Sequence, residues 1–312
     1  MKLVIQIPCY NEEKTLPITL KDLPKSIAGI DKVETLVIND GSTDRTVEVA
    51  RLNGVDHILA LPCRRGLAEA FRRGLDRSIE LGADIIVNTD GDNQYKGEDI
   101  AKLVRPILDK KAEIVVGARD ISAIEHFSAV KKILQDFGSH MVRRFSRTDI
   151  PDTTSGFRAY SREAALKLNV FSDYTYTIET IIQAGRKEIP ITSVPIRTNE
   201  KLRESRLIKS IPNYIMRSVA TMLRVYLMYE PMKFFMRIGM AVILLSLVPW
   251  ARYLFFFLFG EKHGGHIQSL LFGSILFLAG FILCVIGLLG DIIAANRKLG
   301  EEILYRLKKK GS

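Results

Sequence analysis

Two aspartates separated by a single glycine, Asp90 and Asp92, are the residues in this sequence whose spacing best suits metal chemistry. Two carboxylates one residue apart in a tight turn can approach one hard cation from the same side, and Gln94 could add a neutral oxygen. Mg²⁺ or Mn²⁺ held in this way keeps open positions for phosphate oxygens. The pattern suggests a metal site that neutralises a diphosphate leaving group, although an acidic turn without a metal has the same spacing.

Polar segments also follow three other apolar runs in the first half of the chain, at residues 8–12, 39–44 and 117–119. Asp40 has the chemistry to accept hydrogen bonds from a ribose or a base. Glu12 suits either a contact with such a ligand or the first turn of the following helix. Because the chain contains neither GxGxxG nor GxxxxGK[ST], we expect neither a dinucleotide site nor a P-loop.

The elements that must position these residues alternate between short apolar runs and longer amphipathic runs. We expect strands over residues 3–7, 34–39, 57–61, 85–89 and 114–118, and helices over residues 14–23, 44–52, 67–81 and 98–110. The strands are almost continuous in Val, Ile and Leu, which indicates burial on both faces and a parallel sheet. The sequence therefore predicts an open, mostly parallel α/β domain whose ligands bind at the carboxyl ends of the strands.

Charge is distributed unevenly along the 312 residues. Residues 1–199 are close to neutral, whereas residues 200–312 contain 16 Lys and Arg against 7 Asp and Glu, a net charge of +9. Because the basic part also contains the most apolar stretches, we expect a bilayer surface rather than nucleic acid as its partner. The three cysteines lack the spacing of a disulfide framework or a metal site, which favours reduced structural thiols.

Two apolar stretches near the C-terminus are long enough to cross a bilayer. Residues 269–290 contain no charge and have a glycine every seven residues, and residues 238–259 are interrupted only by Pro249 and Arg252. We expect a closely packed transmembrane hairpin; two buried helices of a soluble domain are the alternative. Basic residues flank the hairpin outside its short connection, so the positive-inside rule places the α/β domain and both termini in the cytoplasm.

The predicted organisation has three parts. A cytoplasmic α/β domain covers residues 1–206, a juxtamembrane region covers residues 207–233, and the hairpin with its basic tail covers residues 234–312. Residues 207–229 mix Leu, Ile, Met and Tyr with three basic residues, which is typical of an amphipathic helix in the membrane interface. A helix packed on the soluble domain would fit the first half of this stretch equally well.

Five segments, taken together, resemble the family 2 glycosyltransferases of GT-A fold. In chain order they are Pro8-x-Tyr10-Asn11-Glu12, Asp40-Gly41-Ser42-Thr43-Asp44, Asp90-x-Asp92-x-Gln94, Gly117-x-Arg119 and Asp152-Thr153-Thr154-Ser155-Gly156-Phe157-Arg158. Within that family they look most like the polyprenyl-phosphate glycosyltransferases, of which dolichyl-phosphate mannose synthase is the best-known member. The resemblance covers residues 1 to about 210.

The resemblance implies inverting transfer of a hexose from a UDP- or GDP-sugar to a polyprenyl phosphate, dolichyl or undecaprenyl. The residues implied to hold the nucleotide sugar are Pro8, Tyr10, Glu12, Asp40, Asp90, Asp92 and Arg119. The residues implied to hold Mg²⁺ or Mn²⁺ are Asp90, Asp92 and Gln94, and the implied catalytic set is Asp92, Arg119 and Asp152. Members of the family often oligomerise, so a homo-oligomer is a further expectation.

The acceptor site is expected in the basic segment that follows the last strand. The family pattern there is Arg-x-x-Gly-x-Ser-Lys, but this chain has Arg203-Glu204-Ser205-Arg206 followed by Lys209, without the glycine. We expect the cations Arg203, Arg206 and Lys209 to hold the lipid phosphate. This phosphate is largely dianionic at neutral pH, because its second pKa is about 6. The nucleophile therefore needs little deprotonation, and the reaction does not require Asp152 as a base. Asp152 could act as a base, orient an arginine or contact a sugar hydroxyl.

Three other functions fit parts of the sequence. A processive polysaccharide synthase of the same fold would carry Gln-x-x-Arg-Trp, but the only tryptophan is Trp250, inside an apolar stretch. A membrane-anchored nucleotidyltransferase would need a Gly-rich phosphate loop with a lysine, which the sequence lacks. A non-catalytic membrane module would bind nucleotide sugars without turnover, and an assay of the lipid product distinguishes it from an enzyme.

Overall fold

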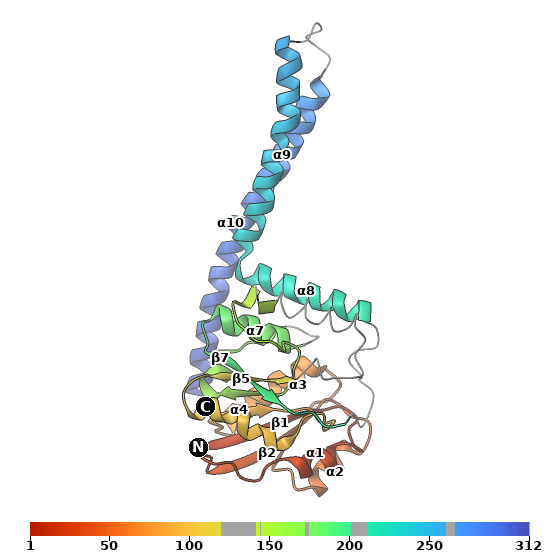
Figure 1. Cartoon of the computed structure of the whole chain (residues 1–312), viewed down its shortest axis with the longest axis vertical. Coiled ribbons are helices and arrows are strands. Elements are labelled where there is room, and N and C mark those ends of the chain that lie inside the picture. The colour runs from red at the N-terminus through yellow and green to blue at the C-terminus, as the bar shows by residue number, and fades with distance from the viewer. Residues whose placement is uncertain (120–141, 144, 172–174, 201–210, 260–265, 312) are drawn as a thin grey trace. The chain divides into compact units, whose positions relative to one another are not determined.

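A computed structural model of the chain describes residues 1–119, 142–143, 145–171, 175–200, 211–259 and 266–311. The chain divides into two compact units. The first comprises Met1–Met222 and Leu304–Ser312, and the second comprises Leu223–Ile303. Figure 1 shows the sheet of the first unit with its helices and the long helices of the second.

A seven-stranded sheet forms the centre of the first unit, with the strand order β3-β2-β1-β4-β6-β5-β7. The strands are β1 (Lys2–Cys9), β2 (Lys32–Asn39), β3 (His57–Ala60), β4 (Ile85–Asn88), β5 (Ile114–Arg119), β6 (Arg158–Ser161) and β7 (Ile191–Ile196). All neighbouring strands are parallel except β6, which runs antiparallel to β4 and β5. The mostly parallel α/β fold and the five predicted strands are confirmed, and β6 and β7 are added to them.

Helices cover both faces of this sheet. They include α1 (Leu16–Asp22), α2 (Thr46–Leu52), α3 (Leu67–Glu80), α4 (Ile100–Leu108), α6 (Arg162–Lys167) and α7 (Thr177–Arg186). Successive residues of β1 alternate between two apolar cores: Leu3 packs in one with Leu103 of α4, and Val4 packs in the other with Phe71 of α3. This two-sided burial explains why the strands are continuous apolar runs. The four predicted helices are confirmed, with ends that differ by at most two residues.

The strand directions bring polar residues to one edge of the sheet. The parallel strands β1, β2 and β4 are paired with Cys9 opposite Asn39 and Gln6 opposite Asn88. The loops that follow these strands therefore meet at their shared carboxyl edge. Because β6 is antiparallel to β4 and begins with Arg158 opposite Asn88, the residues that precede β6 reach the same edge.

Two long apolar helices form most of the second unit, α9 (Pro231–Phe259) and the greater part of α10 (Ile267–Lys310); α8 (Ile211–Tyr229) precedes them. Both α9 and α10 are long and apolar enough to cross a membrane. Gly280 of α10 lies against α9, where an added Cβ atom would be 2.7 Å from the carbonyl oxygen of Gly239. The glycines of α10 therefore allow the close helix packing that their seven-residue spacing predicts.

Candidate active site

The loops after β1 and β2 are locked together at the carboxyl edge of the sheet. Asn11 has a left-handed backbone conformation with a φ of 55°. Its backbone N–H donates to the Ser42 hydroxyl at 3.0 Å, and its side-chain oxygen accepts from the Thr43 N–H at 2.8 Å. The predicted nucleotide contacts Tyr10 and Glu12 flank Asn11, so these bonds fix their backbone against the second loop.

Glu12 is buried in the loop between β1 and α1, four residues before the first residue of α1, while Pro8 lies within β1 itself. The Glu12 carboxylate accepts from the Thr15 hydroxyl at 2.6 Å, and the Glu12 N–H donates to the Thr46 hydroxyl at 2.9 Å. Because α1 has no acidic residue in its first turn, the placement of Glu12 in the first turn of this helix is wrong; Glu12 stands in the loop before it. Its predicted contact with a ligand stays a prediction.

Asp40 is buried, and both of its carboxylate oxygens accept hydrogen bonds from the loop after β3. The donors are the N–H of Arg65 at 2.6 Å and the N–H of Gly66 at 2.9 Å. Gly41 has a φ of 65°, and an added Cβ atom there would lie 2.5 Å from the backbone nitrogen of Arg64. Besides its predicted ribose or base contact, Asp40 therefore holds the loop after β3 in place.

That loop carries Arg64, a residue outside every motif of the sequence. The Arg64 guanidinium lies 4.3 Å from the centroid of the Tyr10 ring. A cation over an aromatic face is attracted to it, so this contact places a flat cation beside a residue predicted to hold the nucleoside. No sequence signal marks Arg64, because basic residues in exposed loops are usually solvated.

The acidic loop after β4 is shaped by its own hydrogen bonds. The Asp92 carboxylate accepts from the backbone N–H of Gln94 at 3.2 Å, and Asn93 between them has a φ of 55°. Asp90 and Asp92 are both partly exposed. Among the residues that the structure describes, no three His, Cys, Asp or Glu side chains gather into a metal site. Two carboxylates and an amide still suit Mg²⁺, which keeps water and phosphate oxygens as its other ligands.

Negative charge is concentrated around this loop, as the raised pKa of the neighbouring Cys9 thiol indicates. Burial raises the pKa of Cys9 well above its ordinary value, and nearby carboxylates raise it further; they belong to Glu12, Asp90, Asp44 and Asp92. A divalent cation would be attracted to this edge of the sheet by the same charges.

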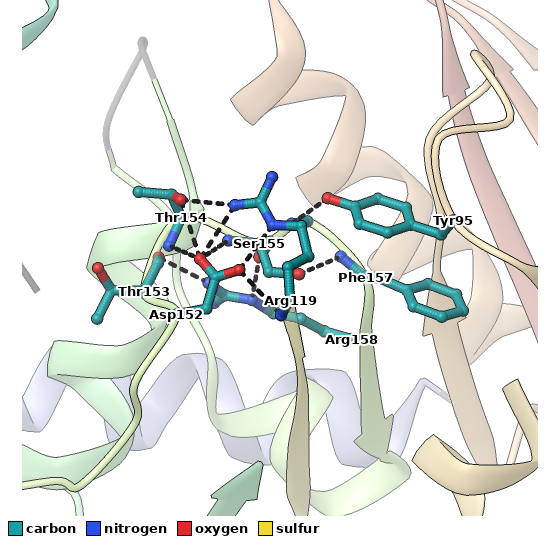
Figure 2. Close-up of polar contacts among 9 residues, drawn as sticks. Tyr95, Arg119, Asp152, Thr153, Thr154, Ser155, Phe157 and Arg158 are labelled. Carbon is teal, nitrogen blue, oxygen red and sulfur yellow. Dashed lines mark hydrogen bonds and ion pairs between the residues drawn. The ribbon is translucent and has the colours of Figure 1, made fainter. Parts of the chain in front are cut away.

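Asp152 and Arg119 form a buried, bidentate ion pair (Figure 2). The Nε of Arg119 donates to Oδ2 of Asp152 at 2.6 Å, and its Nη2 donates to Oδ1 at 3.0 Å. Nη2 also donates to the Thr154 hydroxyl at 2.8 Å. The backbone N–H groups of Thr154 and Ser155 donate to Oδ1 of Asp152, each at 3.2 Å. Two of the three predicted catalytic residues, Arg119 and Asp152, are thus brought together although they stand 33 positions apart in the sequence.

These contacts favour one of the three roles predicted for Asp152, the orientation of an arginine. Burial by itself would raise the pKa of Asp152, but hydrogen bonds from Arg119 and Thr154 outweigh burial and hold the pKa below its ordinary value. An ionised carboxylate with both oxygens occupied is a poor base at neutral pH. The Arg119 side chain is 12% exposed, and its Nη1 has no hydrogen-bond partner among the described residues, so Nη1 can contact a ligand.

Arg158, the first residue of β6, is fully buried and supports the Asp152 loop. Its guanidinium donates to three carbonyl oxygens, those of Ser155 at 2.8 Å, Thr153 at 3.0 Å and Thr177 at 2.8 Å. The sequence motif contained Arg158 but suggested no role for it. The structure shows that Arg158 ties this loop to the first turn of α7.

The segment after β7 is joined to the acidic loop. The backbone N–H of Asn199 donates to the carbonyl oxygen of Gln94 at 2.9 Å, and its side chain donates to that of Asn93 at 3.1 Å. Tyr95 and Thr198 form an antiparallel bridge beside these bonds. The chain that leads to the predicted acceptor cations therefore starts beside the acidic loop. The cations themselves, Arg203, Arg206 and Lys209, lie outside the described residues.

Asp99 anchors the start of this segment. Its buried carboxylate accepts from the backbone N–H of Arg197 at 2.7 Å and from the Arg197 guanidinium at 2.8 Å, and it pairs with Lys102 at 2.9 Å. Burial opposes ionisation, but these contacts lower the pKa of Asp99 to about 2. A carboxyl group whose pKa is lower in the folded chain than in the unfolded chain stabilises the fold. This stabilisation is complete above the unfolded-state pKa of about 4, and it is lost as the pH falls from about 4 to about 2.

We therefore expect the Asp99→Asn variant to unfold about 5 °C below the parent chain at neutral pH, with a gap that closes between about pH 4 and about pH 2. Thermal unfolding followed by circular dichroism across this pH range measures the gap. Asp109→Asn is the control, because Asp109 is 29% exposed and pairs with the exposed Arg105. A gap that stays constant down to about pH 2 would show that the charge of Asp99 is not its cause.

The chain matches the family described as glycosyl transferase family 2 over residues 4–168, more than half of its length. It is 29% identical over 216 residues to the UDP-N-acetylglucosamine–dolichyl-phosphate N-acetylglucosaminyltransferase of Methanococcus voltae. The matched region covers 62% of this chain and 83% of that protein. It is 27% identical over 218 residues to the undecaprenyl-phosphate mannosyltransferase of Micrococcus luteus, which covers 66% of this chain and 88% of that protein.

Among solved structures, glucosyl-3-phosphoglycerate synthase from Mycobacterium tuberculosis has a similar fold. Its complex with phosphoglyceric acid has a TM-score of 0.58 at 21% identity and covers 72% of this chain and 79% of that one. Its complex with Mn²⁺, UDP and phosphoglyceric acid has a TM-score of 0.56 at 19% identity and covers 71% and 78%. This likeness agrees with the predicted fold.

Proposed function

The chain belongs to glycosyl transferase family 2 and is a glycosyltransferase, and on this basis we propose that it transfers a hexose from a UDP- or GDP-sugar to a polyprenyl phosphate with inversion at the anomeric carbon. Relatives named for dolichyl-phosphate and undecaprenyl-phosphate acceptors support this acceptor class. The observation that carries the proposal is the hydrogen-bonded junction between the acidic loop and the segment that leads to the basic residues 203–209.

The donor would bind at the carboxyl edge of the sheet. The nucleoside would contact residues of the first two loops, namely Pro8, Tyr10, Glu12 and Asp40, with Arg64 beside them. Asp90, Asp92 and Gln94 would hold Mg²⁺ or Mn²⁺, which would stabilise the negative charge that develops on the departing diphosphate. A complex of the structural neighbour that contains both Mn²⁺ and UDP supports a divalent cation together with a nucleoside diphosphate, although not the particular residues that hold them.

Arg119 would contact the diphosphate or the sugar through Nη1. Its other nitrogens are held by Asp152 and Thr154. A guanidinium fixed before the substrate arrives needs little rearrangement during the reaction, which is how oriented charges lower a barrier. Asp152 would therefore act through Arg119.

The acceptor phosphate would bind to Arg203, Arg206 and Lys209. Asn199 is hydrogen-bonded to the acidic loop and stands four residues before Arg203, a length of chain that spans at most about 14 Å. The covalent chain thus keeps the first of these cations near the donor site. Several cations there would offset the repulsion between the lipid phosphate and the diphosphate of the donor.

The reaction we propose is a single displacement. An oxygen of the lipid phosphate attacks the anomeric carbon, the bond from that carbon to the diphosphate oxygen breaks, and a nucleoside diphosphate leaves. Attack opposite the leaving group inverts the anomeric configuration. The lipid phosphate is mostly dianionic at neutral pH, because its second pKa is about 6, so no base is required. An ionised Asp152 that orients Arg119 agrees with this chemistry.

We place α9 and α10 across the bilayer, with the first unit and both ends of the chain in the cytoplasm. Basic residues outside the short connection between these helices support that orientation. The acceptor's polyprenyl tail would share the bilayer with the helices. Residues 207–233 would then lie at the interface, where the lipid phosphate emerges.

The test uses the 312-residue chain in liposomes that contain undecaprenyl or dolichyl phosphate. A panel of UDP- and GDP-hexoses is supplied with Mg²⁺ or Mn²⁺, and lipid extracts are examined by mass spectrometry. We expect a polyprenyl-phosphate hexose from at least one donor. Binding of nucleotide sugar without any glycolipid product across the panel would instead indicate a non-catalytic binding module.

Replacing Arg203 and Arg206 together by Ala should raise the apparent KM for the lipid acceptor about tenfold or more, with the KM for the nucleotide sugar changed less than about twofold. Steady-state kinetics with each substrate varied in turn measures both constants. The matched control is the double Ala variant of Arg72 and Arg73, exposed arginines of α3 that pair with Glu69. Equal changes in the two KM values would reject the acceptor assignment.

A further inference from the structure

We infer that Tyr95 is a positioning residue for the transfer reaction: it holds the acidic loop, the Asp152 loop and the segment that leads to the acceptor cations in one arrangement. The inference rests on the proposed function and adds a residue to it. Nothing in the sequence singles out Tyr95, because a tyrosine after an acidic turn is a common surface residue. Its contacts in the structure are what distinguish it.

The backbone of Tyr95 joins the acidic loop to the acceptor side. Tyr95 directly follows Gln94, and it forms an antiparallel bridge with Thr198. Its carbonyl oxygen also accepts from the side chain of Asn199 at 3.3 Å. Movement of the segment after β7 would therefore be transmitted to the loop that carries the two aspartates.

The side chain of Tyr95 contacts the Asp152 loop. Tyr95 is 4% exposed, and its ring stacks on Phe157 with centroids 4.9 Å apart and planes 7° apart. Its hydroxyl accepts a hydrogen bond from the backbone N–H of Gly156 at 3.2 Å. Figure 2 shows this hydroxyl directed toward the pair formed by Arg119 and Asp152.

Gly156 connects the contacts of Tyr95 to both the acidic loop and the Asp152 loop. An added Cβ atom at Gly156 would lie 3.3 Å from each carboxylate oxygen of Asp90, so the glycine backbone packs directly against that aspartate. One residue earlier, the N–H of Ser155 donates to Asp152. A shift of Gly156 would therefore disturb the predicted metal ligand and the carboxylate that orients Arg119.

Removal of the Tyr95 hydroxyl alone would create such a shift. Phenylalanine keeps the stacked ring and the backbone bridge, but it leaves the buried N–H of Gly156 without this acceptor. A buried donor without a partner is costly, so the loop would move to recover a hydrogen bond. Displacement of catalytic groups by about 1 Å can slow a reaction by about 100-fold. The nucleoside contacts lie on other loops and would not change.

We expect Tyr95→Phe to lower kcat about tenfold or more and to change the KM for the nucleotide sugar by a smaller factor, because the nucleoside contacts are kept. The matched control is Tyr305→Phe, which removes a hydroxyl that donates to Glu163 of α6 at 2.7 Å. It should leave both constants unchanged. A purely structural hydroxyl at Tyr95 would lower only the unfolding temperature, so a parental kcat in the folded variant overturns the inference.

A second variant tests the junction from the other side. Asn199→Ala removes the side-chain hydrogen bonds to the carbonyl oxygens of Asn93 and Tyr95, and it should also lower kcat. A parental kcat for this variant counts against the inference, even where Tyr95→Phe does not fold. Glycolipid formation by the parent chain is measured first. Absence of product there refutes the proposed function, whereas parental turnover in the variants refutes only the role of Tyr95.

Discussion

Replacement of Asp92 by Asn should reduce kcat for hexose transfer by at least about 1,000-fold while the protein stays folded and membrane-bound. The amide removes one of two carboxylate charges at the predicted cation site but keeps the shape of the side chain. Its oxygen can still accept the hydrogen bond that Asp92 receives from Gln94. Transfer of radiolabelled hexose into the lipid phase measures the effect, with saturating Mg²⁺ or Mn²⁺ present.

Asp109→Asn is the control for loss of an acidic charge, because Asp109 lies at the end of α4 beside Arg105 and away from the acidic loop. Removal of divalent ions by a chelator should abolish transfer by the parent chain, and added Mg²⁺ or Mn²⁺ should restore it. Turnover by Asp92→Asn within about threefold of the parent would remove the argument for a metal-bridged diphosphate.

The second large effect is expected at Asp152. Replacement of Asp152 by Asn should lower kcat for hexose transfer about 100- to 1,000-fold. Asparagine has one acceptor oxygen, and its amide group would face the donor nitrogens of Arg119. The buried guanidinium would lose its fixed orientation and its counter-charge. Arg119→Lys should have a similar effect, because an ammonium group cannot form the two parallel bonds to Asp152.

A pH profile separates orientation from base catalysis at Asp152. We expect the residual kcat of Asp152→Asn to depend on pH as it does in the parent chain, because the pKa of Asp152 is lowered and its carboxylate stays ionised at neutral pH. A catalytic base would instead produce an acid limb in the parent profile that disappears in the variant. Loss of such a limb would contradict the orienting role.

Strands buried on both faces are the part of this fold that a sequence predicts best. Residues of β1 such as Leu3 and Ile5 are fully buried, so nearly every position is apolar. The short strand β6 has no such signal, because it spans only Arg158–Ser161 and begins with an arginine. The carbonyl oxygens that make burial of Arg158 possible come from residues before β6 and from α7, and only the folded chain shows them.

The candidate site likewise contains some residues that the sequence identifies and others that only the folded chain shows. Spacing identifies Asp90 and Asp92, because both carboxylates stand in one turn. The pairing of Arg119 with Asp152 depends on an antiparallel strand beside β5, which the sequence did not predict. Arg64 and Tyr95 are common residue types in common loop positions, and their contacts arise from loops that are distant in the sequence.

The proposed attack of the lipid phosphate on the anomeric carbon is tested most directly by measuring which nucleotide is released, and how much of it, for each glycolipid formed. Direct attack of the lipid phosphate on the anomeric carbon predicts one nucleoside diphosphate for each polyprenyl-phosphate hexose, with the anomeric configuration inverted. Chromatography of the nucleotides, with mass spectrometry and NMR of the lipid, measures all three quantities. Release of a nucleoside monophosphate together with a lipid diphosphate sugar would contradict the account.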